Sequence, residues 1–209
     1  MVEQKSLRYR NITISGLPGA GSSTLGKGLK KILDWEYFAG GDFMRQYAVK
    51  QGLFDKGVPL HHGAAVYGDE FDKKVDYGMR QSLQEEEGRI LDAWLSGFMA
   101  QEIKGVLKVL VFCSNDGIRV DRIVNRDRVG VEEAKEHVFT RERENLSKWS
   151  RMYKKEWEKW VPKSLQSARR GEWLDFYHPD LYDLAIDTYA YDREASLKQV
   201  LDKMGFKET

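Results

Sequence analysis

A glycine-rich run at residues 16–24, with the sequence GLPGAGSST, holds the residue types best suited to chemistry in this chain. Its spacing matches the P-loop pattern G-x-x-x-x-G-K-[ST], with Gly16 and Gly21 at the glycine positions and Ser23 at the Mg²⁺-binding hydroxyl. Glycines let backbone N–H groups approach a phosphate closely, and a helix that starts behind them adds the positive end of its dipole. We therefore predict a phosphate-binding loop formed by Gly16, Gly19, Ala20, Gly21, Ser22, Ser23 and Thr24.

The loop lacks the lysine of the pattern, because Ser22 stands at that position. One positive charge is therefore missing from the predicted phosphate site. Lys27 lies more than a turn into the helix that should follow, and we expect its side chain to face solvent. The loop indicates phosphate binding, and it leaves the exact reaction open.

Length and composition restrict the class of protein. The 209 residues suit a single domain, and a net charge of +1 gives no overall electrostatic reason to bind nucleic acid or an anionic membrane. Cys113 follows the apolar residues 109–112, which suits a reduced core thiol. The first residues contain no apolar signal segment, and nowhere do 18 apolar residues run together. We expect a soluble cytoplasmic protein without nucleic-acid or membrane partners.

The elements around the loop alternate between strand and helix. Strands are predicted at residues 11–15, 36–39, 89–92, 106–113 and 182–188, and helices at 25–33, 42–49, 70–86, 131–160 and 194–204. This alternation predicts an α/β fold with a doubly wound, five-stranded parallel sheet. Ligands bind at the carboxyl ends of such strands, where the loop, Asp42, Asp92 and Asn115 fall.

Charged residues near these strand ends suit phosphoryl transfer, which needs positioned positive charge around the moving phosphate. Arg122 and Arg126 lie four apart on one predicted helix face, where one guanidinium could stack on adenine and the other reach phosphate, and Arg141 follows on the long helix. Asp92 either holds Mg²⁺ with Ser23 or caps a helix. For four other arginines we expect solvated positions: Arg119, Arg128, Arg143 and Arg151.

An aromatic stripe runs along the predicted helix 131–160 at four- and three-residue spacing. Its members are Trp149, Tyr153, Trp157 and Trp160. Such stripes usually pack, so we expect it to contact the domain itself or a second subunit, which would allow a homodimer through residues 149–160. A base-stacking face is the alternative. Residues 163–180 then form an unusually long connection, expected to be irregular.

Over most of its length the chain resembles the nucleoside monophosphate kinases, and most closely the archaeal-type cytidylate kinases. Residues 16–24 match G-[LP]-P-G-x-G-T-T-T, which implies that the missing lysine is a family trait. Residues 41–45 match A-G-E-x-F-R, which implies that Arg45 binds the acceptor phosphate. Further matches are FD at 71–72 and VD at 75–76, RD at 126–127 with VEEA at 131–134, RE at 141–142 before WSRMY at 149–153, and YDLAIDT at 182–188.

This resemblance implies one kinase domain over residues 1–209, with an acceptor-binding insertion at about 40–88, a lid at about 126–160 and an extra connector at about 161–181. It implies transfer of the γ-phosphate of Mg·ATP to a nucleoside monophosphate, with CMP or dCMP favoured. The implied catalytic groups are Asp92, Arg126 and Arg141, with Arg122 near the adenine. The implied acceptor side comprises Asp42, Arg45, Asp72, Asp76, Trp94 and Lys148.

At three places the chain departs from the family's sequence pattern, and these differences leave the acceptor and the activity open. Leu91-Asp92-Ala93-Trp94 replaces L-E-G-R, and Trp94 cannot act as a bidentate guanidinium. Lys148 replaces a lid arginine and is a less directional donor. The stretch 154–181 is longer than the family's connector. A kinase for a different small acceptor and a nucleotide-binding protein without catalysis therefore remain alternatives.

Overall fold

The computed structural model describes residues 7–44 and 67–207, and its centre is the predicted parallel sheet. The strands are β1 (Asn11–Gly16), β2 (Glu36–Ala39), β3 (Arg89–Asp92), β4 (Val106–Phe112) and β7 (Leu184–Asp187). They lie in the order β2-β3-β1-β4-β7, and every neighbouring pair is parallel. The strand that leads into the glycine loop is thus the central one, and the predicted fold class is confirmed.

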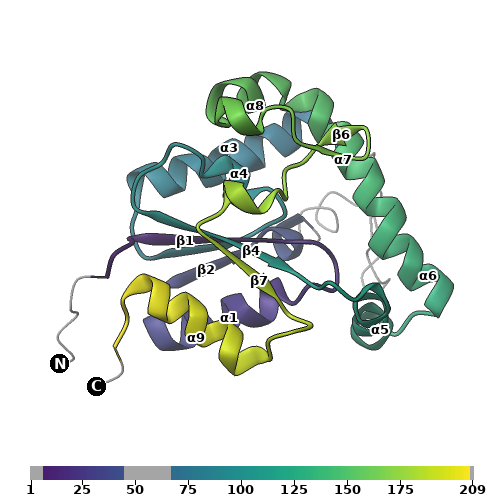
Figure 1. Cartoon of the computed structure of the whole chain (residues 1–209), viewed down its shortest axis with the longest axis horizontal. Coiled ribbons are helices and arrows are strands. Elements are labelled where there is room, and N and C mark those ends of the chain that lie inside the picture. The colour runs from purple at the N-terminus through teal and green to yellow at the C-terminus, as the bar shows by residue number, and fades with distance from the viewer. Residues whose placement is uncertain (1–6, 45–66, 208–209) are drawn as a thin grey trace.

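Helices cover both faces of this sheet (Figure 1). On one face α1 (Ser22–Leu33) and α9 (Arg193–Met204) pack with Ile12 and Ile14 of β1 in a single apolar cluster. On the other lie α3 (Asp69–Glu85) and the short α4 (Ser96–Met99). Because alternate β1 side chains point to opposite faces, Asn11, Thr13 and Ser15 are buried on this second side.

A helical arm continues beyond the sheet from α5 (Asp116–Asp127). It comprises α6 (Val131–Lys135), a π-helical turn η1 (Glu136–Thr140), α7 (Arg141–Met152) and α8 (Lys154–Trp160). The sequence predicted one continuous helix over 131–160. The helix instead contains the π turn and breaks at Tyr153, whose φ of −111° and ψ of 22° leave the helical region. The buried side chain of Tyr153 donates to Asp76 of α3 at this break.

The aromatic stripe of this arm is buried inside the chain. Its four rings belong to one core cluster with Phe98 of α4 and Phe176, and Trp157 is only 2% exposed. The stripe thus packs against the domain itself, which is one of the two contacts expected for it, and a homodimer through residues 149–160 stays a prediction. The burial of these rings contradicts the base-stacking alternative.

The long connection after α8 is ordered rather than irregular. It forms the 3₁₀ turns η2 (Lys163–Leu165) and η3 (Pro179–Leu181) and a small antiparallel hairpin of β5 (Arg169–Arg170) and β6 (Trp173–Leu174). Leu174, Phe176 and Leu181 bury their side chains in the aromatic core. Among the described residues, no helix is long and apolar enough to cross a membrane.

Candidate active site

The glycine loop joins the end of β1 to the start of α1 at the carboxyl edge of the sheet. Gly19 and Gly21 have φ values of 78° and 97°, which L side chains rarely adopt. A Cβ at Gly19 would lie 2.5 Å from the backbone oxygen of Arg119, so only glycine fits there. No side-chain hydrogen bond caps the start of α1, which leaves its first N–H groups available to an anion.

A buried carboxylate lies beside this loop. The hydroxyl of Ser23 donates to Oδ2 of Asp92 at 2.8 Å, and the hydroxyl of Tyr37 donates to the same oxygen at 2.7 Å. Burial raises the pKa of Asp92, and the hydrogen bonds from Tyr37 and Ser23 oppose that rise because they stabilise the carboxylate. The helix that follows β3 has Leu95 at its N-cap and no side-chain cap hydrogen bond, so the alternative of Asp92 as a helix cap is wrong.

The neighbours of this carboxylate suit a hard divalent cation. A serine hydroxyl and a carboxylate oxygen are ligands that Mg²⁺ accepts, and here they lie within hydrogen-bond distance. Asp42 is exposed, within residues 40–44, which are helical, and its charge acts on both Asp92 and Tyr37. Ser23 and Asp92 could therefore hold Mg²⁺ at the mouth of the loop.

Arg122 ties the loop to the segment that follows β7. Its Nη1 donates to the carbonyl of Gly19 at 3.0 Å and to Oγ1 of Thr188 at 2.8 Å, and Nη2 donates to the carbonyl of Thr188 at 3.0 Å. Arg126, four residues later, is 54% exposed and forms a two-pronged ion pair with Asp127. The structure thus brings Arg122 to the loop and leaves Arg126 at the surface.

Trp94 lies between the sheet and the helical arm. The guanidinium of Arg141 lies over the Trp94 ring, 5.1 Å from its centroid, and Trp149 meets the same ring edge to face at 5.4 Å. The residue that departs from the resembled family is therefore in direct contact with a predicted catalytic arginine.

Two carboxylates of α3 face the arm. Lys148 forms an ion pair with Asp72 at 2.7 Å and donates to the carbonyl of Tyr67 at 2.7 Å. The hydroxyl of Tyr153 donates to Asp76 at 2.6 Å, and burial raises the pKa of Asp76 to about 7. These predicted acceptor residues thus join α3 to α7 and to the break before α8. Arg45 lies outside the described residues.

Comparison with known proteins identifies the family. A family model described as the cytidylate kinase-like family matches residues 11–190. The chain belongs to this family. It is 29% identical to the cytidylate kinase of Haloarcula marismortui, over 91% of this chain and 86% of that protein, and 29% identical to that of Methanothrix thermoacetophila, over 91% and 95%. The resemblance drawn from the motifs is confirmed.

A solved structure supports the fold assignment. The gluconokinase of Sinorhizobium meliloti matches with a TM-score of 0.54 at 10% identity, covering 95% of this chain and 93% of that one. At this identity the likeness concerns the fold alone. This member of the cytidylate kinase-like family therefore shares its fold with that gluconokinase.

Sequence reasoning missed two residues near the site of this family member. Arg119, expected in solvent, is buried, because it donates to the carbonyl of Pro18 in the loop and pairs with Glu142 of α7. In the sequence Tyr37 is an ordinary strand residue, and only its hydrogen bond to Asp92 shows that it belongs to the candidate site. The spacing of charges along a helix carries no sign of which of them are buried.

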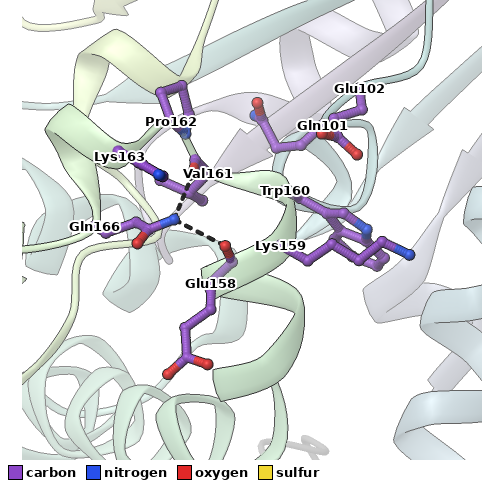
Figure 2. A pocket seen from close by; sticks show the side chains of 9 residues that line it. All are labelled: Gln101, Glu102, Glu158, Lys159, Trp160, Val161, Pro162, Lys163 and Gln166. Carbon is purple, nitrogen blue, oxygen red and sulfur yellow. Dashed lines mark hydrogen bonds between the residues drawn. The ribbon is translucent and has the colours of Figure 1, made fainter.

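A hollow of about 440 Å³ lies at the end of α8 (Figure 2). Its lining comes from α8, the connector and the segment after α4: Gln101, Glu102, Glu158, Lys159, Trp160, Val161, Pro162, Lys163 and Gln166. Gln166 donates there to the carbonyls of Glu158 and Val161, so its amide closes the turn after α8. None of the predicted site residues lines this hollow.

Proposed function

We propose that this protein transfers the γ-phosphate of ATP to a nucleoside monophosphate, with CMP or dCMP as the preferred acceptor. The observation that carries the proposal is the hydrogen bond from Ser23 to the buried Asp92 beside the glycine loop. The names of the relatives support cytidine nucleotides as acceptors.

On the donor side, the backbone N–H groups of residues 16–24 and the start of α1 bind the ATP phosphates. Ser23 and Asp92 hold Mg²⁺, which neutralises charge on the phosphates when it is bound. Arg122, already anchored at Gly19 and Thr188, borders the adenine. The guanidinium carried by α7, Arg141, stabilises charge on the phosphate in transfer. Arg126 joins Arg141 in this role once the ion pair between Arg126 and Asp127 breaks.

The acceptor side combines two cations with several carboxylates. We assign acceptor binding to Asp42, Arg45, Asp72, Asp76, Trp94 and Lys148. The pairing of Lys148 with Asp72 lets a carboxylate orient the ammonium, which by itself is a poorly directional donor. A nucleoside monophosphate would then contact α3 and α7 together.

The test is ADP release with Mg·ATP and a panel of CMP, dCMP, UMP and AMP. We expect the highest kcat/KM with CMP or dCMP. Asp92→Asn should lower kcat by about 100-fold or more, since metal-assisted charge stabilisation contributes several kcal/mol. Asp202→Asn, on the exposed face of α9, is the matched control and should behave as the wild type. Turnover of Asp92→Asn equal to that of the control would refute the metal assignment.

A second acceptor class is favoured by the contact of Trp94 with Arg141. If Trp94 shapes a pocket for another acceptor, Trp94→Arg should lower activity on that acceptor, because it places a second guanidinium beside Arg141 and removes the ring against Trp149. A rise in CMP turnover in this variant would instead identify a cytidylate kinase that has lost one phosphate contact. ATP binding without turnover on any acceptor would identify a non-catalytic nucleotide-binding protein.

A further inference from the structure

A buried carboxylate at the start of α7 bridges two arginines from different parts of the chain. Glu142, whose side chain is 10% exposed, accepts from Nη2 of Arg119 in α5 at 3.2 Å. Its other oxygen, Oε1, accepts from Nε and Nη2 of Arg170 in β5, both at 2.8 Å. A carboxylate held by two guanidiniums is fixed in direction, because each pairing is charge-assisted and directional.

The Arg119 end of this bridge reaches the phosphate loop. Nε of Arg119 donates to the carbonyl of Pro18 at 3.2 Å, and its backbone lies against Gly19. Nη1 donates to Asp116 at 3.0 Å. The guanidinium therefore connects the loop, the start of α5 and Glu142.

The Arg170 end of the bridge belongs to the hairpin of the long connector. The same hairpin contacts α7 a second time, since the backbone N–H of Leu174 donates to Oγ of Ser150 at 2.9 Å. Two contacts, eight residues apart along α7, hold this helix against the hairpin. The connector thus acts on α7 along most of its length.

We propose that Arg170, through Glu142 and Arg119, clamps the first turn of α7 to the phosphate loop and so positions Arg141 for the transfer reaction. This role rests on the proposed function, in which Arg141 contacts the moving phosphate. Arg170 is a positioning residue, because it acts through Glu142 and touches no predicted substrate site.

The local structure explains why this turn needs a clamp. The π-helical turn η1 directly precedes Arg141, and π turns interrupt the regular hydrogen bonding of a helix. The arm therefore has a weak point immediately before the residue that must be held accurately. A displacement of about 1 Å at a reacting group can cost about 100-fold in rate.

The chain offers a matched pair of arginines for the test. Arg170 is 43% exposed, so Arg170→Ala leaves Glu142 paired with Arg119 and should still fold. Its neighbour Arg169 is exposed and donates only to the nearby carbonyls of Gln166 and Ala168 among the described contacts. Arg169→Ala is the control. Arg170→Lys keeps the positive charge at position 170 and tests whether that charge alone restores the contact with Glu142.

Two measurements separate the clamp from the proposed function. Hydrogen exchange of residues 136–146 needs no substrate, and we expect Arg170→Ala to accelerate it about fivefold while Arg169→Ala does not. In turnover, kcat of Arg170→Ala should fall about fivefold with the KM for ATP within about twofold of wild type, and Arg170→Lys should recover part of the loss.

The outcomes are distinct. Equal exchange and equal kcat in Arg170→Ala and Arg169→Ala would overturn the clamp. Faster exchange with unchanged kcat would overturn the positioning of Arg141. If the wild type transfers no phosphate to any acceptor, the proposed function fails, and the exchange measurement still decides whether the clamp exists.

Discussion

At the scale of single residues, the oxygen Oδ2 of Asp92 is where two elements meet the predicted metal ligand. It receives hydrogen bonds from Ser23 and from Tyr37, and the Tyr37 ring packs against Gly26 of α1. Tyr37 therefore connects β2, β3 and the first helix at the predicted metal ligand. A tyrosine in this place orients the carboxylate, and its hydrogen bond lowers the pKa of Asp92 against the rise that burial causes.

Tyr37→Phe tests this role through pH. Loss of the donated hydrogen bond removes stabilisation of the carboxylate, so the pKa of Asp92 should rise further above its ordinary value. Since the metal needs the ionised form, the acidic limb of kcat/KM should move to higher pH. Near neutral pH we expect activity to fall about tenfold, because hydrogen bonds to charged groups contribute ~1.5–3 kcal/mol. The measurement is a pH profile with Mg·ATP.

Tyr9→Phe, at a tyrosine that like Tyr37 packs against the α1–α9 cluster, is the control for this experiment. It should keep the wild-type profile. An unshifted acidic limb in Tyr37→Phe would show that Asp92 does not control the reaction through this oxygen.

At the scale of elements, the junction between α3 and the arm buries a carboxyl group, Asp76, whose pKa lies close to neutral pH. Tyr153 occupies the break between α7 and α8 and donates to Asp76, and the neighbouring pair Asp72–Lys148 adds charges of both signs. Burial raises the pKa of Asp76 to about 7. The folded protein therefore holds a proton there that the unfolded chain releases near pH 4.

This difference predicts how stability changes with pH. The contribution of Asp76 is fully present below about pH 4 and is lost as pH rises through about 7, because the unfolded state binds fewer protons in that range. Asp76→Asn removes the titration while its amide oxygen still accepts from Tyr153. From pH 5 to pH 8, the wild type should lose ~2–3 kcal/mol more of its free energy of unfolding than the variant.

Urea denaturation at the two pH values measures this effect. Asp202→Asn, on the exposed part of α9, should follow the wild type. Parallel pH dependence in wild type and Asp76→Asn would mean that Asp76 is ionised in the folded protein.

At the scale of the whole molecule, the two faces of the sheet have different structural roles. The α1–α9 face is a largely aliphatic layer that includes Ala20 of the glycine loop. The opposite face carries the aromatic core, in which α4, α7, α8 and the connector pack together (Figure 1). The arm that bears Arg141 and Lys148 is thereby fused to the domain through large buried rings.

Trp157→Ala tests whether the stripe serves this internal core. Trp157 packs against Phe98 and Phe176 and donates to the carbonyl of Gln166 at 3.1 Å. The variant should lose ~3–5 kcal/mol of its free energy of unfolding. Tyr189→Ala, at a 60% exposed position, should change it by less than about 0.5 kcal/mol.

Protein concentration provides the second readout of this experiment. A core within one chain makes the loss independent of concentration, whereas a contact between copies would make the unfolding midpoint rise with concentration. A concentration-dependent loss in Trp157→Ala would therefore contradict the internal packing of the stripe.

The sequence alone determined the sheet, the glycine loop and the family, because local patterns carry them. Alternating strands and helices specify a parallel sheet, and Gly19 and Gly21 are needed wherever a backbone must turn with positive φ. The sequence also predicted that Asp92 lies near the glycine loop, since each follows a strand and the carboxyl ends of parallel strands meet at one edge of the sheet. The roles of the site residues stay predictions for the experiments above.

Only the tertiary structure decided which side chains meet. Arg119 and Arg126 are seven residues apart on one helix, yet one is buried against the loop and the other is exposed, because burial depends on what packs over each position. The pairing of Glu142 with Arg170 and of Tyr37 with Asp92 spans 28 and 55 residues. No local spacing encodes such contacts, since they form when separate elements pack on the same sheet.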